Sequence, residues 1–251
     1  MKSEIHCAVI GSGKIALDLL VKLKKSPYLK PILVAGQRKE SEGLAFAHKL
    51  GVPTSDKSIE AILKTDARII FDCTTASSHL KHAPLLKDRF LIDLTPAKVL
   101  PICVPTIKSA SQIKGKGVNL GTCTVQAVLP KLIGIKHLSY VEVVTTIASD
   151  SAGMGTRENI SEYLETTAKI IKDFTGARAK AILIINPTIQ AMHNTIYYQT
   201  KGLDKVKIIQ FEMQGKGDYL DKRFGNLDTM TISAILVAEN YAKNYNLRLN
   251  A

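Results

Sequence analysis

The sequence predicts an α/β protein in which a Rossmann-type, doubly wound parallel sheet is combined with a second, α+β substrate domain. Short continuous apolar runs alternate with helical patterns through the first half of the chain, which is typical of strands buried on both faces of a parallel sheet. Three prolines (Pro96, Pro101, Pro105) then interrupt the pattern, and longer β-rich segments follow. The change in pattern indicates two domains.

In the first half, each predicted strand is followed by a helical pattern. The apolar run at 6–10 leads through a glycine turn into a helix at about 14–25. Further strands are expected at 31–35, 67–71 and 90–93, and further helices at 41–50, 58–63 and 77–87.

The second half predicts a largely antiparallel sheet with one strong helix. Strands are expected at 140–148, 179–185 and 205–213, with a glycine-rich loop at 151–156 and helices at 157–174 and 227–245. We expect the last helix to return and pack on the first domain. The predicted boundaries are therefore 1–122 for the dinucleotide-binding domain, completed by a C-terminal helix at 226–251, and 123–225 for the α+β domain.

Bulk composition indicates a soluble globular protein. The chain has 251 residues, of which 45% are hydrophobic, and no apolar run is long enough to span a bilayer. The charged N-terminus leads straight into a strand, so no signal peptide is expected. Four cysteines (Cys7, Cys73, Cys103, Cys123) show no close pairing and no metal-ligand spacing, which predicts reduced thiols, a cytoplasmic location and no metal.

The formal net charge is +12, from 34 Lys and Arg against 22 Asp and Glu. The lysines are dispersed, aromatic residues make up only 6% of the chain, and no nucleic-acid-binding module is recognisable, so nucleic acid is not the expected partner. An anionic nucleotide, coenzyme A or an acidic carrier protein would suit this charge equally well. A lysine-rich surface without a specific partner is an equally good reading.

A dinucleotide-binding turn is predicted where the first strand meets the first helix. Residues 11–16 (Gly-Ser-Gly-Lys-Ile-Ala) fit G-x-G-x-x-A: Gly11 permits the turn, Gly13 lets the backbone approach a pyrophosphate, and Ala16 allows close packing of the helix. The predicted cofactor contacts here are Gly11, Ser12, Gly13, Lys14 and Ile15. The alternative is a tight turn that binds no ligand.

The end of the second strand bears on the choice of cofactor. A carboxylate that would bind the ribose 2′-hydroxyl of NAD is absent, and Gln37, Arg38 and Lys39 stand there instead. Arg38 could pair with a 2′-phosphate, which favours NADP(H) slightly over NAD(H) and hence reductive chemistry. The alternative is that these cations are solvated turn residues.

Cys123 is the candidate nucleophile. A short apolar run ends at Gly121 and Thr122, and a helical pattern begins at once, which places the thiol in the first turn of a helix. Unpaired backbone N–H groups and the helix dipole favour negative charge there, so we expect a lowered pKa for this thiol and a site that can hold an oxyanion. The alternative from the local sequence is a small buried thiol.

Several stretches together resemble the acylating acetaldehyde dehydrogenases, which convert an aldehyde, coenzyme A and NAD to an acyl-CoA and NADH. The matching stretches are AVIGSGKI (8–15), FDCTTASSHLKHAP (71–84), IDLTPAKVLPICVP (92–105), TCTVQAVLP (122–130), SAGMGTRENISEYLETT (151–167) and FGNLDTMT (224–231). Their order and spacing agree across most of the chain.

The resemblance implies a mechanism and a set of site residues. It places the nucleophile at Cys123 and implies an acyl thioester on it, with NAD or NADP and either coenzyme A or a carrier-protein phosphopantetheine as the thiol partner. It also implies a homodimer. It adds cofactor contacts at Ser151, Ala152, Gly153, Met154, Gly155, Thr156, Arg157, Asn159 and Asn226.

The chain also departs from the family. The usual Cys-Gly-Gly-Gln-Ala reads Cys123-Thr124-Val125-Gln126-Ala127, which adds two side chains beside the thiol. At the position of the family's active-site Asp this chain has Asn194, which cannot act as a carboxylate base. His193 therefore becomes a candidate acid or base. A segment of several tens of residues is missing before the strand at 205–213, so the family's partner aldolase is doubtful.

These observations predict an NAD(P)-dependent oxidoreductase that interconverts an acyl thioester and an aldehyde through Cys123, in the reductive direction. Cys123, His193 and Asn194 are its candidate catalytic residues. One alternative is a Rossmann reductase that acts on an imine or free carbonyl without a covalent intermediate. Another is a non-catalytic, nucleotide-binding partner protein.

Overall fold

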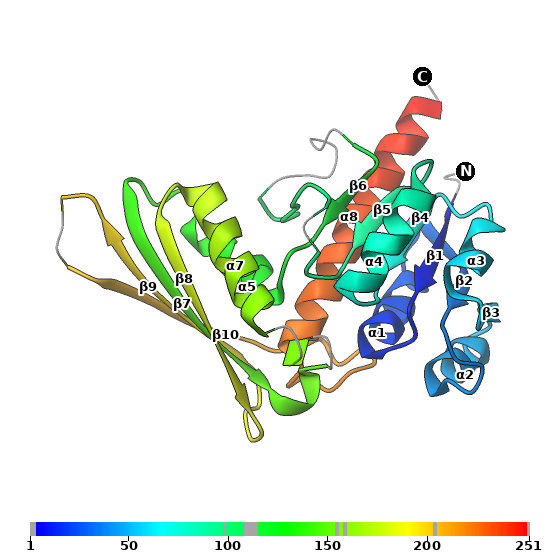
Figure 1. Ribbon diagram of the computed structural model, residues 1–251, viewed down its shortest axis with the longest axis horizontal. Coiled ribbons are helices and arrows are strands. Elements are labelled where there is room, and N and C mark those ends of the chain that lie inside the picture. The colour runs from blue at the N-terminus through cyan, green and yellow to red at the C-terminus, as the bar shows by residue number, and fades with distance from the viewer. Residues whose placement is uncertain are drawn as a thin grey trace. The chain divides into compact units, whose positions relative to one another are not determined.

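The computed structural model describes residues 4–97, 99–107, 115–153, 156–157, 160–202 and 205–249 (Figure 1). The chain divides into two compact units. Unit 1 comprises Met1–Leu120 and Thr231–Ala251, and unit 2 comprises Gly121–Met230. The C-terminal helix α8 (Gly225–Leu249) begins in unit 2 and continues into unit 1. None of the helices in these ranges is both long and apolar enough to cross a membrane.

Unit 1 is built on a six-stranded sheet in the order β3-β2-β1-β4-β5-β6, in which every neighbouring pair is parallel. The strands are β1 (Ile5–Ile10), β2 (Leu29–Ala35), β3 (Thr54–Ser55), β4 (Ile69–Asp72), β5 (Phe90–Asp93) and β6 (Gly117–Asn119). The neighbouring inner strands β4 and β5 are buried at every position. Continuous burial explains why these strands read as apolar runs rather than as alternating patterns.

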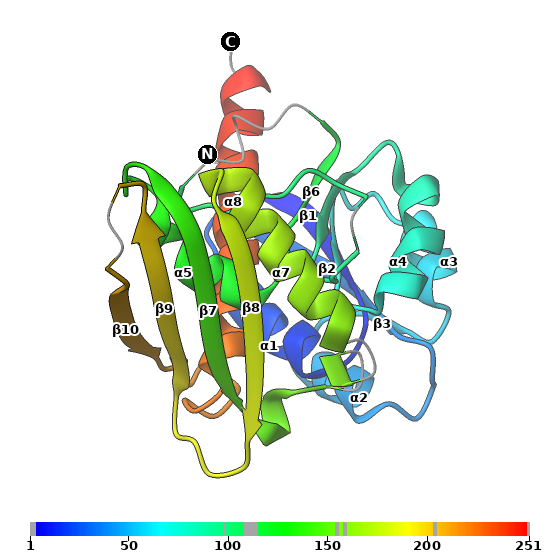
Figure 2. The same ribbon diagram turned by 60° about the vertical axis from the view of Figure 1, so that its left-hand side comes forward.

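Helices cover both faces of this sheet. They are α1 (Lys14–Leu23), α2 (Glu42–Lys49), α3 (Ser58–Leu63) and α4 (Ala76–His82), which continues into the 3₁₀ turn η1 (Ala83–Leu86). In Figures 1 and 2, α1 and α8 lie on one face of the sheet, and α3 and α4 on the other. The predicted doubly wound α/β fold is therefore confirmed.

Helix α8 is tied to unit 1 by polar and aromatic contacts. The Thr231 hydroxyl donates a hydrogen bond of 2.5 Å to the buried carboxylate of Asp18 in α1, which also pairs with Lys22 at 2.5 Å. The ring of Tyr241 stacks on Phe90 of β5 with centroids 4.1 Å apart. Through these contacts the last helix packs on the parallel-sheet unit.

Unit 2 contains a four-stranded sheet in the order β10-β9-β7-β8. The strands are β7 (Leu138–Ala148), β8 (Arg178–Asn186), β9 (Met192–Thr200) and β10 (Lys207–Met213). β9 pairs antiparallel with β7 and β10, and β8 pairs parallel with β7. Helices α5 (Cys123–Leu132) and α7 (Ile160–Thr175) cover one face of this sheet (Figure 2).

Three observed strands had no counterpart in the elements expected from the sequence: β3, β6 and β9. β3 has two residues and β6 three, which is too short for a periodic signal. β9 is long, but its sequence (MHNTIYYQT) is polar at several positions, and half of its side chains face away from the two helices. The structure places it at the centre of the antiparallel part of the sheet.

Candidate active site

The turn between β1 and α1 can be made only by glycine at position 11. Gly11 has a φ of +112°, a backbone conformation that L side chains rarely adopt. A Cβ built on Gly11 would lie 2.7 Å from the backbone oxygen of Cys73, which follows β4. The turn and the segment after β4 are therefore in direct backbone contact at the carboxyl edge of the sheet.

The N-terminus of α1 offers donors to an anion. Gly13 is its N-cap, and no side-chain hydrogen bond caps the helix among the described residues. A Cβ built on Gly13 would meet nothing within 4 Å in the described part of the chain. Lys14 is exposed and Ile15 half-buried in the first turn. An uncapped helix start behind an unobstructed glycine fits a dinucleotide pyrophosphate.

Two serines join this turn to the segment after β2. The hydroxyls of Ser12 and Ser41 lie 2.9 Å apart, and Ser41 caps α2 by accepting from the Leu44 N–H. Arg38 is exposed in the same segment, which also carries the exposed Glu40. The predicted dinucleotide residues of unit 1 thus gather at one edge of the sheet.

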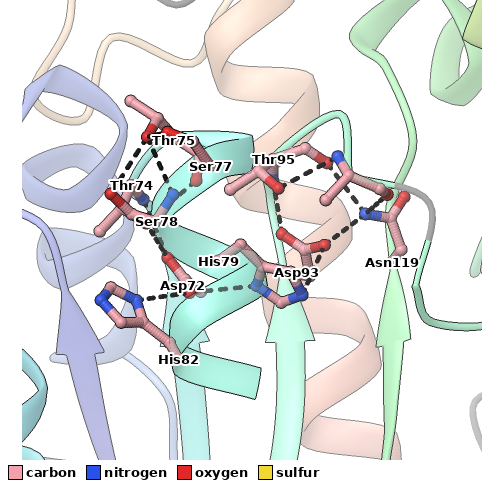
Figure 3. A network of polar contacts seen from close by, with 11 residues as sticks. Asp72, Thr74, Thr75, Ser77, Ser78, His79, His82, Asp93, Thr95 and Asn119 are labelled. Atoms are coloured by element: carbon pink, nitrogen blue, oxygen red, sulfur yellow. Dashed lines mark hydrogen bonds and ion pairs between the residues drawn. The ribbon is translucent and has the colours of Figure 1, made fainter. Parts of the chain in front are cut away.

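A buried polar cluster closes the carboxyl ends of β4, β5 and β6 (Figure 3). Asp72, Asp93 and Asn119 are the last residues of these three strands. His79 of α4 lies between the two carboxylates, with Nδ1 3.1 Å from Asp72 and Nε2 3.2 Å from Asp93. The contact with Asp93 is close enough for an ion pair but is not aligned as a hydrogen bond. His82 adds a second imidazole, 3.1 Å from Asp72.

The cluster also fixes the loops that follow the strands. Asp72 Oδ1 accepts from the N–H of Thr74 at 3.1 Å and from its hydroxyl at 2.5 Å. Asp93 accepts from the Thr95 N–H at 2.8 Å and from the Asn119 amide at 2.5 Å. The described residues contain no group of three or more His, Cys, Asp or Glu side chains that could hold a metal ion. The cluster therefore braces three strand ends through hydrogen bonds and ion pairs.

The environments of the two carboxylates push their pKa values apart. Burial raises the pKa of Asp93 to about 6. The charge of His79 and the hydrogen bonds from Thr95 and Asn119 lower this pKa, but by less than burial raises it. Burial opposes ionisation of Asp72 as well, but hydrogen bonds from His79, His82 and Thr74 outweigh it and lower its pKa. For His79, burial is outweighed by the hydrogen bond that it donates to Asp72 and by the charges of both carboxylates, so its pKa is raised.

In unit 2, Cys123 is the first residue of α5, as the sequence predicted. Gly121, with a φ of +66°, turns the chain into the helix, and Thr122 caps it by accepting from the Val125 N–H at 3.2 Å. The Thr122 hydroxyl lies 2.8 Å from that of Thr167 in α7. The start of α5 is thus fixed against α7.

The Cys123 sulfur belongs to a buried hydrogen-bond network. Sγ lies 3.1 Å from the hydroxyl of Tyr163 in α7, and that hydroxyl lies 2.7 Å from Oγ1 of Thr124. Thr124 donates to Thr145 of β7 at 2.9 Å, and Thr145 donates to Oδ1 of Asn194 in β9 at 2.9 Å. Two helices and two strands therefore contribute to one continuous chain of polar groups.

The pKa expected for Cys123 was wrong in direction. Burial raises the pKa of this thiol, and the contact with the Tyr163 hydroxyl and the hydrogen bonds from the backbone N–H groups of Thr124 and Cys123 offset only part of that effect. The position at a helix start was predicted correctly, but the cost of burying a thiolate, which the sequence does not show, is larger.

The two candidate catalytic residues on β9, His193 and Asn194, lie on opposite faces of the strand. Asn194 is buried and ends the network, and its Nδ2 has no hydrogen-bond partner among the described residues. His193 points to the opposite face of the strand, where its Nε2 lies 3.3 Å from Glu212 and about half of its side chain is exposed. Because neighbouring residues in a strand face opposite sides, only one of the two can join the network of Cys123. His193 therefore lies outside the network of Cys123.

Part of the predicted cofactor loop after β7 is described. The Ser151 hydroxyl donates to Ala148 O, and the Arg157 guanidinium donates to the carbonyls of Ala152 and Ser149. Gly153 is exposed, and its carbonyl accepts from the N–H groups of Thr156 and Arg157. Met154, Gly155 and Asn159 lie outside the described residues. Arg157 thus holds the loop backbone in place.

Asn226, in the first turn of α8, carries an unused acceptor. The residue is buried, and its Oδ1 has no hydrogen-bond partner in the described part of the chain. A buried polar atom without a partner is costly, and such atoms in native structures often meet a ligand or an ordered water. Asn226 therefore fits the cofactor contact that the sequence resemblance implied.

Several residues of these networks were not among the predicted site residues. Tyr163 and Thr145 approach Cys123 and Thr124 only in three dimensions, and no local pattern marks them. Asp72, His79 and His82 lie within one of the matched stretches, where an acidic residue ends a strand and two histidines follow on one helix. That spacing was a usable signal for a buried cluster.

A parallel sheet with a glycine turn, combined with a cysteine at a helix start, is an arrangement expected of an oxidoreductase. The family model described as "Prokaryotic acetaldehyde dehydrogenase, dimerisation" matches residues 123–220. An acetaldehyde dehydrogenase of Carboxydothermus hydrogenoformans is 41% identical, with 97% of this chain and 95% of that protein covered. The acetaldehyde dehydrogenase of Desulfitobacterium hafniense is also 41% identical, with 97% of each chain covered.

The chain belongs to the acetaldehyde dehydrogenase family, and it is an oxidoreductase that acts on aldehydes. The alignment with the Carboxydothermus protein runs over 284 positions, more than the 251 residues of this chain, so that relative carries residues that this chain lacks. The crystal structure of aspartate semialdehyde dehydrogenase II from Vibrio cholerae is similar in fold, with a TM-score of 0.64 at 12% identity over 97% of this chain and all of that one.

Proposed function

We propose that the protein reduces an acyl thioester to an aldehyde with NAD(P)H, through a covalent thioester on Cys123, and that acetyl-CoA is its first substrate to test. The observation that carries the proposal is the placement of Cys123 at the start of α5 in a chain 41% identical to acetaldehyde dehydrogenases. Coenzyme A or the phosphopantetheine of a carrier protein would be the departing thiol. The basic composition suits either anionic partner.

In unit 1, the turn at Gly11 to Ile15 would hold the pyrophosphate of the dinucleotide. The uncapped start of α1 supplies backbone N–H groups, and the open side of Gly13 leaves room for the phosphates. When bound, the reduced nicotinamide supplies the hydride that converts the enzyme thioester to the aldehyde. Arg38 is the candidate contact for a 2′-phosphate, so we propose NADP(H) as the preferred form.

In unit 2, the sulfur of Cys123 would form a bond to the acyl carbon while the bond from that carbon to the departing sulfur breaks. The thiol proton of Cys123 leaves, and the departing thiolate takes up one proton, so the exchange is balanced. The backbone N–H groups at the start of α5 can stabilise the oxyanion of the tetrahedral intermediate. Asn226 Oδ1 could accept a hydrogen bond from the cofactor, for example from a carboxamide N–H.

We also propose that the protein is a homodimer. The support is the match of residues 123–220 to a family model described as a dimerisation domain. The sheet of unit 2 lies within those residues, and one of its faces is free of the helices α5 and α7. A cytoplasmic location agrees with the sequence and with the reduced state expected for its cysteines. The aldolase partner of the family stays outside the proposal.

The covalent mechanism is tested by following the loss of reduced nicotinamide absorbance with acetyl-CoA, using NADH and NADPH in parallel. We expect turnover by the wild-type protein and a loss of about 10³-fold or more in Cys123→Ser. Cys103→Ala is the matched control, because it removes a buried thiol in unit 1 and should retain the rate. Arg38→Ala should weaken binding of NADPH but not of NADH.

Two results would contradict parts of this proposal. Unchanged turnover in Cys123→Ser would indicate a Rossmann reductase that acts on a carbonyl without a covalent intermediate. Absence of turnover on acetyl-CoA and on longer acyl thioesters, in a wild-type protein that binds the dinucleotide, would reject the thioester substrate class.

A further inference from the structure

The hydrogen-bond network of Cys123 has a direction that can be worked out by counting protons. Oδ1 of Asn194 can only accept, so Thr145 must donate its single hydroxyl proton to it. Thr145 then has no proton left for Thr124, and Thr124 must donate to Thr145. The amide of Asn194 on β9 thus determines that the Thr124 hydroxyl donates to Thr145.

The same count continues to the sulfur. Because the Thr124 proton is used, the Tyr163 hydroxyl must donate to Thr124 Oγ1 across the 2.7 Å contact. Tyr163 then has only an oxygen lone pair left for Cys123, 3.1 Å away, so Cys123 must donate its S–H proton. In this arrangement Cys123 is a neutral thiol, and the Tyr163 hydroxyl does not donate to its sulfur.

The geometry points to a reversible relay: we propose that the amide of Asn194 sets the direction of the hydroxyl network and thereby controls ionisation of Cys123. A half-turn of the amide presents Nδ2 to Thr145 in place of Oδ1. The hydroxyls then rotate in sequence, so that Thr145 donates to Thr124, Thr124 donates to Tyr163, and Tyr163 donates to the Cys123 thiolate. The relay deepens the proposed function by naming groups that regulate its nucleophile.

Asn194 is suited to both directions because it is an amide. In the observed orientation its Nδ2 is buried without a hydrogen-bond partner among the described residues. In the reversed orientation Oδ1 takes that place, so each state leaves one end of the amide unused. An aspartate at this position would only accept when ionised, whereas the amide can donate or accept without a change in charge.

No atom of the relay gains or loses a net proton. Each hydroxyl turns about its C–O bond and exchanges one hydrogen-bond partner for another. The proton released when Cys123 ionises leaves from the sulfur to water or, in thioester exchange, is matched by the proton that the departing thiolate takes up. Tyr163, Thr124 and Thr145 are thus positioning residues.

The surroundings of the thiol keep the relay isolated from other charges. In the described part of unit 2, Tyr163 on α7 is the titratable side chain that hydrogen-bonds Cys123. The other hydroxyl and amide contacts come from Thr124 on α5, Thr145 on β7 and Asn194 on β9, all of them neutral. Control of the thiol therefore passes through dipoles whose direction substitutions can change.

The relay is tested by the pH dependence of Cys123 alkylation with iodoacetamide, followed on the peptide that contains Cys123 by mass spectrometry. Tyr163→Phe removes the hydroxyl that lies 3.1 Å from the sulfur, and we expect alkylation at a fixed pH below the thiol pKa to slow about tenfold, the order of one hydrogen bond to an ionised group. Thr145→Val frees the Thr124 proton for Tyr163, and we expect alkylation to speed up about tenfold.

Two further variants complete the test. Asn194→Leu removes only the terminal acceptor and should act in the same direction as Thr145→Val. Thr146→Val makes the same chemical change one residue along β7, on the opposite face of the sheet, and should leave the pH profile unchanged. Thermal unfolding of each variant shows whether its fold is retained.

Opposite shifts in Tyr163→Phe and Thr145→Val distinguish a relay from loosened packing. If both substitutions speed up alkylation, or if neither shifts the profile, the relay is rejected. Alkylation requires no turnover, so this result is independent of the thioester assay with Cys123→Ser. The proposed function can therefore fail while the relay stands, and the relay can fail while the function stands.

Discussion

Gly11 and Gly13 stand two residues apart in the same turn, yet the structure gives them different roles. Gly11 adopts a φ of +112°, and an added Cβ would lie 2.7 Å from the backbone oxygen of Cys73. Gly13 has a φ of −84°, and an added Cβ would touch nothing within 4 Å in the described residues. Gly11 is therefore needed by the fold, and Gly13 by the proposed ligand.

We expect Gly11→Ala to lower the free energy of unfolding by about 1–3 kcal/mol, because it combines backbone strain with a clash against a backbone atom. Gly13→Ala should leave stability nearly unchanged and weaken dinucleotide binding, since its methyl group would occupy the place of a phosphate. Denaturant unfolding and fluorescence titration with NADH and NADPH measure the two effects. Equal loss of stability in both variants would contradict the separation of roles.

At this scale the sequence predicts positions better than environments. The place of Cys123 at a helix start followed from Gly121, Thr122 and the apolar spacing of α5. Its raised pKa did not, because the burial that raises it depends on α7, 40 residues further along the chain. Tyr163 itself looks like an ordinary helix residue until the fold brings its hydroxyl to the sulfur.

At the scale of elements, the buried cluster of Figure 3 determines how the ends of β4, β5 and β6 respond to pH. Asp93, with its pKa raised to about 6, binds more protons in the folded than in the unfolded state between about pH 4 and 6. Stability from this group is therefore lost as the pH rises through that window. His79, whose pKa is also raised, loses its stabilising proton as the pH rises further.

Asp72 acts in the opposite direction at lower pH. Its lowered pKa makes the ionised carboxylate stabilising above about pH 4, and that contribution is lost as the pH falls. We therefore expect stability to be greatest near pH 4 and to decline by up to about 3 kcal/mol between about pH 4 and 6, using 1.36 kcal/mol per pKa unit for Asp93. Urea unfolding at a series of pH values measures the profile.

Asp93→Asn is the control for this prediction, because the amide keeps an acceptor for Thr95 but cannot titrate. The decline between pH 4 and 6 should shrink in this variant, while contributions from other groups stay the same. An identical slope in both proteins would show that Asp93 does not titrate as described.

The sequence predicted those elements whose burial is continuous or strictly periodic. The central strands of unit 1 and the helices α1, α2 and α7 could be placed from their apolar spacing. β9 could not, because it alternates between a face packed against α5 and a face with His193 and Tyr197. Its partners β7 and β10 are required before the alternation can be interpreted.

At the scale of the whole molecule, the free face of the unit 2 sheet accounts for the proposed homodimer. Strand register places side chains of all four strands on this face, including Ile184, Thr146, His193 and Glu212 in one row. Ile184 and Ile208 are 44% and 56% exposed. The ion pairs His193–Glu212 and Lys180–Glu142 lie among these apolar side chains. A mixed surface of this kind, repeated by two-fold symmetry, is typical of a homodimer interface.

We expect the wild-type protein to run at twice the chain mass in size-exclusion chromatography with light scattering, and Ile184→Lys to shift it towards the monomer. The added charge would lie in the proposed interface. There the two introduced lysines would either repel each other near the symmetry axis or each be buried without an ion-pair partner. Leu80→Lys is the matched control, because Leu80 is 53% exposed on α4 of unit 1, outside the residues that match the dimerisation model. A dimer that survives Ile184→Lys but is lost in Leu80→Lys would place the interface on unit 1 instead.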